Sequence, residues 1–176
     1  GLGEHWDRVT EEEKTPQLIR WFDVEKFSKI ISVFPFAGYS KDRIRSPSYD
    51  YWNELFSILI NQFDYTIFHF GHFNEPDFGE ELKVGKYFNY TSKSFFDQIK
   101  MALGTDFSLN SDSGTGLIMG AYSHPQITLL CQWNIGHVEN PLSLSPKNIN
   151  NITLYHKNDC NSINQEEVIE KIKLLI

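Results

Sequence analysis

The sequence has little of what marks several common protein classes. Its 176 residues include only two cysteines, too few for the disulfide framework that holds small secreted domains together. No apolar run is long enough to cross a membrane, and no secretory signal opens the chain. We therefore expect a cytoplasmic location and no transmembrane segment, and we expect the two Asn-X-Thr sequons, at Asn89 and Asn151, to be coincidental.

Long blocks of like charge are also missing. The net charge is −7, and acidic and basic residues are interspersed along the chain. This pattern argues against a broad nucleic-acid-binding surface but is compatible with a local phosphate site. The sequence also has no internal repeat, no Walker-type phosphate loop, no Gly-X-Ser-X-Gly elbow and no Cys-X-X-Cys pair.

The residues that are present suit one domain with a full core, since 40% are apolar and 15% aromatic. The polar segment 1–28 is expected to be a linker or N-terminal extension with a short helix at 15–22, and 29–176 the domain itself. Short apolar runs predict strands at 29–34, 65–70, 86–90, 107–110, 126–130 and 151–155. Helical spacing predicts helices at 48–63, from 91 or 92 to 103, at 117–122 and at 165–175.

Strands that alternate with helices, each strand nearly all apolar, indicate an α/β fold. We predict a Rossmann-like three-layer sandwich with a mostly parallel sheet covered on both faces. Ser48 is expected to cap the first main helix, and Thr91 or Ser92 the second, whose inward side chains would be Phe95, Phe96, Ile99 and Leu103.

In such a sheet, ligands bind beyond the carboxyl ends of the strands. Those ends are the loop 35–47, the loop 71–80, the turn 111–116 and the long loop 131–147. The residues of chemical interest therefore fall on one edge of the sheet. This convergence is stronger evidence for a site than any single motif.

The turn Ser111-Asp112-Ser113-Gly114-Thr115-Gly116 is the most informative of these segments. Backbone N–H groups at a helix start lack internal partners, the helix dipole adds positive charge, and glycines let a ligand approach closely. The turn therefore suits a phosphate or a sugar. An ordinary capped helix after a strand would have the same pattern.

Four segments together resemble the C-terminal half of a GT-B glycosyltransferase. The first is a strand and basic loop, 31–47, with Lys41, Arg43 and Arg45 before Ser46-Pro47. The others are FHFGHFNE at 68–75, the stretch 90–107 with Thr105-Asp106 before a strand, and the Asp-Ser-Gly segment within 111–130. The nearest resemblance is to the ADP-heptose:lipopolysaccharide heptosyltransferases, glycosyltransferase family 9, over about residues 29–175.

The resemblance implies a donor site for a nucleotide diphosphate sugar. Lys41, Arg43 and Arg45 would neutralise the diphosphate, and Glu75 would bind the two ribose hydroxyls. The remaining donor-binding candidates form the turn: Asp112, Ser113, Gly114, Thr115 and Gly116. Asp112 would accept hydrogen bonds from sugar hydroxyls or cap the helix. For the basic residues and Glu75, a solvated loop is the plain alternative.

The implied activity is transfer of a sugar from a nucleotide diphosphate to a glycan or lipopolysaccharide-like acceptor. The acceptor site and catalytic base would lie on an N-terminal half for which this chain has no room, and no cofactor or metal is implied. His69 and His72 have a metal-like spacing, but one falls within a strand, so zinc is not expected.

The sequence departs from the family pattern in the helix after Asp-Ser-Gly. Thr115 and Leu117 stand where the family often has proline and histidine, and Ser46 stands in place of the usual tryptophan. These departures keep open a non-catalytic binding or assembly module. A nucleotide-sugar epimerase-like enzyme built on the same half-fold is the other alternative.

Overall fold

The computed structural model describes residues 29–37, 45–131 and 150–175. The expected extension at 1–28, with its helix, lies outside the described residues. So do Lys41, Arg43 and nearly all of the predicted loop 131–147. None of the helices within the described ranges is long and apolar enough to cross a membrane.

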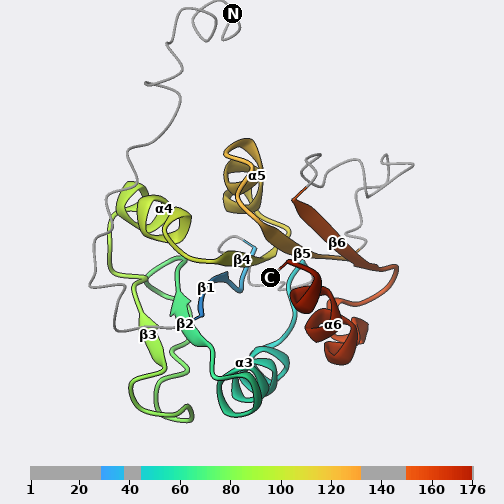
Figure 1. Ribbon diagram of the computed structural model, residues 1–176, viewed down its shortest axis with the longest axis horizontal. Helices are drawn as coiled ribbons and strands as arrows, with labels where there is room; N and C mark the ends of the chain where they lie inside the picture. Colours follow the sequence, from blue (N-terminus) through green and yellow to red (C-terminus); the bar gives the residue numbers. More distant parts are fainter. Residues whose placement is uncertain (1–28, 38–44, 132–149, 176) are drawn as a thin grey trace, which may run out of the picture.

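The fold is built on one parallel sheet of six strands in the order β3-β2-β1-β4-β5-β6 (Figure 1). The strands are β1 (Ile30–Phe34), β2 (Thr66–His69), β3 (Tyr87–Asn89), β4 (Phe107–Ser111), β5 (Gln126–Cys131) and β6 (Asn151–His156). Each predicted strand is present within one or two residues of its expected bounds. Every pair of neighbours is parallel, which confirms the predicted Rossmann-like sheet.

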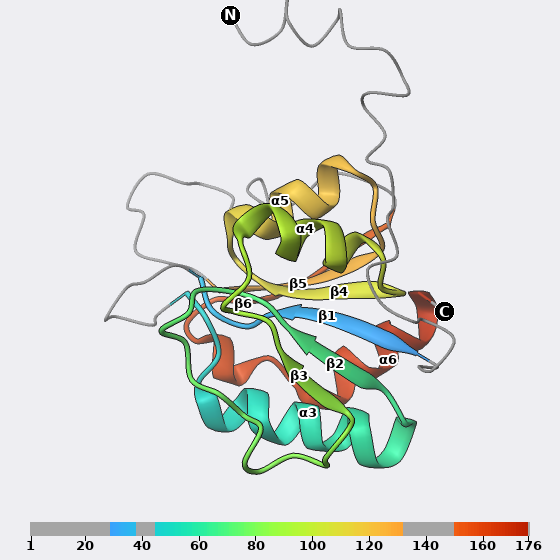
Figure 2. The ribbon, with the colours of Figure 1, turned by 90° about the vertical axis from the view of Figure 1, so that its left-hand side faces the viewer.

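Helices cover both faces of the sheet, as the apolar strands require. The helices α4 (Phe95–Leu103) and α5 (Gly114–Ala121) lie on one face, and α3 (Tyr49–Phe63) and α6 (Gln165–Leu175) lie on the other (Figure 2). Each face has its own buried apolar cluster. The three-layer sandwich expected from the sequence is therefore confirmed.

Helix α3 shows why periodicity worked well here. The Ser48 hydroxyl accepts a hydrogen bond from the backbone N–H of Tyr51 at 3.3 Å, which is the predicted cap. Asp64 ends the helix in the left-handed conformation, with φ of 60°. The buried side chains are those at helical spacing: Tyr51, Trp52, Leu55, Phe56, Leu59 and Ile60.

Helix α4 corrects the sequence prediction in two ways. Its cap is Ser94, which accepts from the N–H of Asp97, and not Thr91 or Ser92. Its first two residues point away from the core, since Phe95 is 50% and Phe96 74% exposed. The helix begins later than predicted, so these rings fall in its first turn, while its buried face consists of Gln98, Ile99, Met101, Ala102 and Leu103.

Helix α5, unlike α4, begins earlier than the sequence suggested. It starts at Gly114, so Gly114, Thr115 and Gly116 belong to its first turn and not to a preceding loop. It ends at Ala121, and Ser123 adopts a φ of 54° before His124. The shift places the N-terminus of α5 directly after β4, at the carboxyl edge of the sheet.

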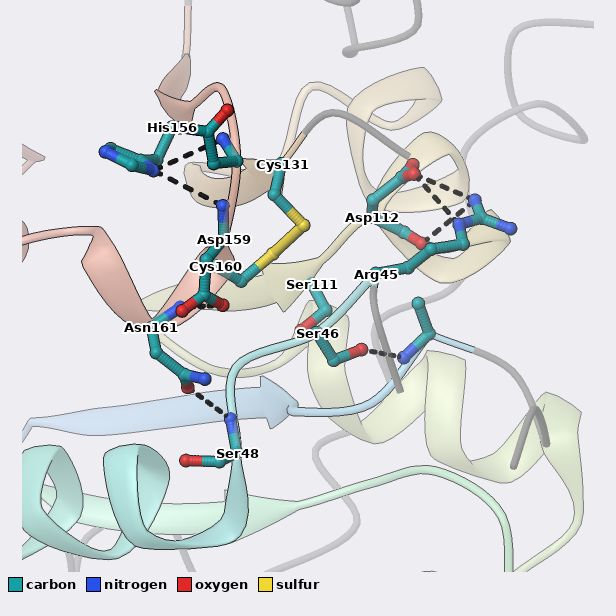
Figure 3. The surroundings of a disulfide bond; sticks show 12 residues. Arg45, Ser46, Ser48, Ser111, Asp112, Cys131, His156, Asp159, Cys160 and Asn161 are labelled. Carbon is teal, nitrogen blue, oxygen red and sulfur yellow. Dashed lines mark hydrogen bonds and ion pairs between the residues drawn. A yellow bond between two sulfur atoms is a disulfide. The ribbon is translucent and has the colours of Figure 1, made fainter. Parts of the chain in front are cut away.

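A disulfide joins Cys131, at the end of β5, to Cys160 in the short 3-10 helix η3 (Cys160–Ser162) (Figure 3). Next to it, the side chain of Asn161 accepts a hydrogen bond from the N–H of Ser48 at 2.7 Å, which ties η3 to the start of α3. Cysteine count alone gave no reason to expect this bond. Since disulfides persist mainly in oxidising compartments, it argues against the cytoplasmic location, which stays a prediction.

Candidate functional site

A pocket of about 510 Å³ lies at the carboxyl edge of the sheet, in the size range of small-molecule sites. Residues after β1, β2 and β4 line it, together with the first turns of α4 and α5. The chain order reverses between β1 and β4, because β2 and β3 extend the sheet on one side and β5 and β6 on the other. The pocket therefore occupies the switch point where α/β sheets of this kind bind ligands.

One wall of the pocket is the N-terminus of α5, with Ser113, Gly114 and Thr115 lining the cavity. Ser113 occupies the cap position, but its hydroxyl makes no cap hydrogen bond and lies 2.5 Å from that of Thr115. A Cβ added to Gly114 would meet no atom within 4 Å. A ligand therefore has open space beside the first-turn N–H groups, which carry the positive end of the helix dipole.

Gly116 is placed differently from the other residues of the turn. A Cβ there would lie 3.5 Å from the Cβ of Asn110, and its carbonyl oxygen accepts a hydrogen bond from the amide of Gln126 at 3.1 Å. Asn110 in turn donates to the Gln126 carbonyl oxygen at 2.8 Å. Gly116 thus packs α5 onto β4 and β5 and does not line the pocket, and its role toward a ligand stays a prediction.

Arg45 and Asp112, predicted for separate roles, bind each other (Figure 3). The Nη2 of Arg45 lies 2.8 Å from a carboxylate oxygen of Asp112 and 3.3 Å from its backbone carbonyl, and Nε donates to the same carboxylate at 3.2 Å. The Asp112 side chain is only 15% exposed and that of Arg45 35%. The pair adjoins the pocket through Ser113 without lining it, and a ligand phosphate would have to share this guanidinium.

Glu75, in the loop after β2, also lines the pocket. One carboxylate oxygen accepts a hydrogen bond from the N–H of His72 at 2.9 Å, and the other lies 3.3 Å from Nε2 of His69. The N–H of Glu75 donates to the carbonyl of His72 at 2.8 Å, closing a tight turn. The carboxylate is therefore held at the pocket surface and is not a solvated loop side chain.

The pocket also contains two residues that the sequence did not single out: the polar Gln98 and the cationic Lys93. The Gln98 amide nitrogen donates to the carbonyls of Gly71 at 3.0 Å and Lys93 at 2.9 Å, and its oxygen accepts from the N–H of Gly71 at 2.8 Å. This buried side chain fixes the two loops after β2 and β3 against each other. A glutamine on the inward stripe of an amphipathic helix was the available signal.

The rest of the pocket wall is largely aromatic: Phe34, Phe36, His72, Phe73 and Phe95. The rings of His72 and Phe73 lie 4.3 Å apart between centroids. Such a wall suits the flat face of a nucleobase or the apolar face of a sugar.

Within the described ranges, no group of three or more His, Cys, Asp and Glu side chains is arranged to hold a metal ion. His69 and His72, whose spacing resembled a metal motif, belong to no such group among these residues. His69 contacts Tyr87 through Nδ1 and Glu75 through Nε2. His72 lies on the pocket wall instead.

Comparison with solved structures identifies the fold. The ADP-heptose lipopolysaccharide heptosyltransferase II of E. coli superposes with a TM-score of 0.70 at 19% identity, over 96% of this chain and 52% of that one. A glycosyltransferase family 9 protein from Veillonella parvula gives 0.68 at 15%, over 95% and 52%. E. coli heptosyltransferase WaaC with ADP-2-deoxy-2-fluoro heptose gives 0.66 at 14%, over 90% and 47%.

The chain has the fold of one half of these GT-B glycosyltransferases. It spans about half the length of each solved structure, as a single Rossmann-like unit would. No protein-family model and no curated protein matches the sequence. The family resemblance seen in the sequence is thus confirmed at the level of the fold.

Proposed function

We propose that the protein is the donor-binding half of an inverting glycosyltransferase, which uses a nucleoside diphosphate sugar and a glycan or lipopolysaccharide-like acceptor. The observation that supports this most is that the N-terminus of α5 and Glu75 line the same pocket and form two of its walls. A nucleoside diphosphate has an anionic end and a vicinal pair of hydroxyls, which match these two walls.

In this proposal, the N–H groups of Gly114 and Thr115 bind the diphosphate. As the bond between the anomeric carbon and the diphosphate oxygen breaks, negative charge develops on the leaving phosphate. Fixed N–H groups and the nearby cations Lys93 and Arg45 would stabilise that charge better than water, because they need no reorganisation. The acceptor hydroxyl attacks from the opposite face, and its proton passes to a base on the other half of the enzyme.

The solved structures that share the fold suggest which nucleotide to test first. One E. coli heptosyltransferase was solved with ADP and with an ADP-linked fluoro sugar, so ADP is the first nucleotide to test. The acceptor-binding half is proposed to be a separate segment or chain, since this chain spans about half of each neighbour. The scheme uses no metal or other cofactor.

The test is a thermal-shift and calorimetric screen of the chain against ADP, UDP, GDP, CDP and their common sugars. One preferred ribonucleoside diphosphate should stabilise the native state, by about 2.7 kcal/mol at a hundredfold excess over its Kd. The gain should shrink in Arg45→Ala, which removes a cation next to the pocket. Absence of binding by all of them would overturn the proposal and favour the non-catalytic module, whereas donor turnover without an acceptor would indicate the epimerase-like enzyme.

A further inference from the structure

The Glu75 carboxylate is held in a single pose by groups on three sides. His72 donates its backbone N–H to one oxygen at 2.9 Å, and the ring of His69 faces the other at 3.3 Å. Gly71, with φ of 150°, lies so close that a Cβ there would come within 2.2 Å of the carboxylate. The side chain is only 10% exposed, and what remains accessible faces the pocket.

His69 connects this carboxylate to a second polar side chain inside the fold. It lies in β2, fully buried, and its ring packs against that of Phe78 at 5.5 Å. Its Nδ1 is 2.7 Å from the hydroxyl of Tyr87, in the neighbouring strand β3. That hydroxyl also accepts the N–H of Phe78 at 3.3 Å and is hydrogen-bonded to Asp77. A chain of four side chains therefore runs from Asp77 to Glu75.

A carboxylate only accepts hydrogen bonds, so the contact between His69 and Glu75 requires a proton on Nε2 of His69. If the Tyr87 hydroxyl donates to Nδ1 of His69, the neutral ring carries its proton on Nε2. In this arrangement Nδ1 accepts from the Tyr87 hydroxyl at 2.7 Å and Nε2–H donates to the Glu75 carboxylate at 3.3 Å.

The ionisation of Tyr87 and of Asp77 agrees with this direction. Burial above all raises the pKa of Tyr87, so its hydroxyl remains a donor. Burial alone would raise the pKa of Asp77, but hydrogen bonds from the N–H of Gly79 and from the side chains of Asn89 and Tyr87 outweigh it and lower that pKa. Asp77 is therefore an ionised acceptor at the end of this series of side chains that is remote from Glu75.

We propose that His69 and Tyr87 are positioning residues, which hold the Glu75 carboxylate toward the ribose diol of a nucleotide and so make the pocket select ribonucleotides. This rests on the proposed donor-binding function. Neither residue lines the pocket, so neither is expected to touch the ligand. A carboxylate fixed in one pose can accept from both hydroxyls without losing rotamer freedom on binding.

The test compares ADP with 2′-deoxyADP, and UDP with 2′-deoxyUDP, by calorimetry on the full chain, with inorganic pyrophosphate as the ribose-free probe. The wild-type protein should prefer one ribonucleotide over its deoxy form by about tenfold or more, as expected for a hydroxyl bound to a charged group. His69→Phe keeps a ring of similar shape but cannot donate to Glu75. It should bring the preference close to one and leave pyrophosphate binding unchanged.

Two conservative variants separate positioning from packing. In His69→Gln the amide can still donate to Glu75, so it should recover most of the preference. Tyr87→Phe removes the hydroxyl that orients His69, so this variant should lose much of the preference for the ribonucleotide. Tyr49→Phe is the matched control, because it removes an exposed tyrosine hydroxyl that contacts the same loop, through Glu81 and the Asp77 carbonyl, and it should change nothing.

The outcomes separate this inference from the proposed function. If no nucleoside diphosphate binds the wild-type chain, the proposed function fails. If ADP or UDP binds with a ribose preference that His69→Phe and Tyr87→Phe both retain, the positioning role fails and the donor site stands. Loss of pyrophosphate binding together with the preference would also overturn it, since the pocket itself would have collapsed. Should His69→Phe not fold, Tyr87→Phe and His69→Gln decide.

Discussion

One methyl group at Gly114 tests the anion-binding wall of the pocket. A Cβ at this position would meet no atom within 4 Å, and the residue has no positive φ, so Gly114→Ala should leave the fold intact. The same methyl would occupy the space through which a phosphate oxygen reaches the first-turn N–H groups of α5. Loss of one hydrogen bond to a charged group is worth about 1.5–3 kcal/mol, which is about a 10- to 150-fold loss of affinity.

Gly116→Ala is the matched control in the same helix. Its Cβ would lie 3.5 Å from that of Asn110, an ordinary contact away from the pocket, so nucleotide affinity should not change. Replacing glycine within a helix should raise the free energy of unfolding by up to about 1 kcal/mol. The affinity of both variants for ADP is measured by calorimetry, and their free energy of unfolding is measured in urea. Wild-type affinity in Gly114→Ala, or equal weakening in both, would refute the anion site at this turn.

Three further predictions concern charge, oxidation and pH. Arg45→Ala should weaken ADP binding about tenfold in calorimetry while changing stability by less than about 1 kcal/mol, because its pair with Asp112 is partly exposed; unchanged affinity would remove Arg45 from the site. Replacing Cys131 and Cys160 by serine should lower the free energy of unfolding in urea by about 3–4 kcal/mol, given their separation of 29 residues; equal stability of the wild type with and without reductant would mean that the bond does not form in solution. Burial lowers the pKa of His124 from 6.5 to about 4 in the folded protein. As the pH falls, His124 is therefore protonated in the unfolded chain at a higher pH than in the folded one. Stability should be steady above pH 6.5 and fall by about 3 kcal/mol toward pH 4, and His124→Leu should flatten that decline.

The sheet and the best-formed helix could be read from the sequence because their signals are local. The strands β1, β4 and β5 are short segments in which apolar residues recur and every side chain is buried, and α3 repeats its apolar positions over four turns behind a serine cap. Because all the strands are parallel, their carboxyl ends lie at one edge of the sheet, whatever the exact bounds of each strand. The predicted position of Glu75 at this edge follows from that topology alone.

The errors arise where local signals end. At the start of α4, Thr91, Ser92 and Ser94 are all acceptable caps, and the structure uses the last, which turns Phe95 toward the pocket. The disulfide and the Arg45–Asp112 pair each join segments far apart in sequence, so no spacing rule could find them. Lys93 carried no motif and became a candidate only once the pocket was located.

The groups proposed to bind the donor differ in whether they are already positioned for a ligand, and this difference affects how a donor would bind. Glu75 is fixed by hydrogen bonds within the protein, and the first turn of α5 opens on free space, so the ribose and the first phosphate would meet groups already in place. Arg45, in contrast, is engaged by Asp112 through two nitrogens. A phosphate that recruits this guanidinium must compete with a carboxylate or share the cation with it, which reduces the net gain from the contact. Most of the donor affinity should therefore come from the ribose and the helix terminus together. A nucleoside diphosphate should then bind much more tightly than inorganic pyrophosphate, which can use only one wall.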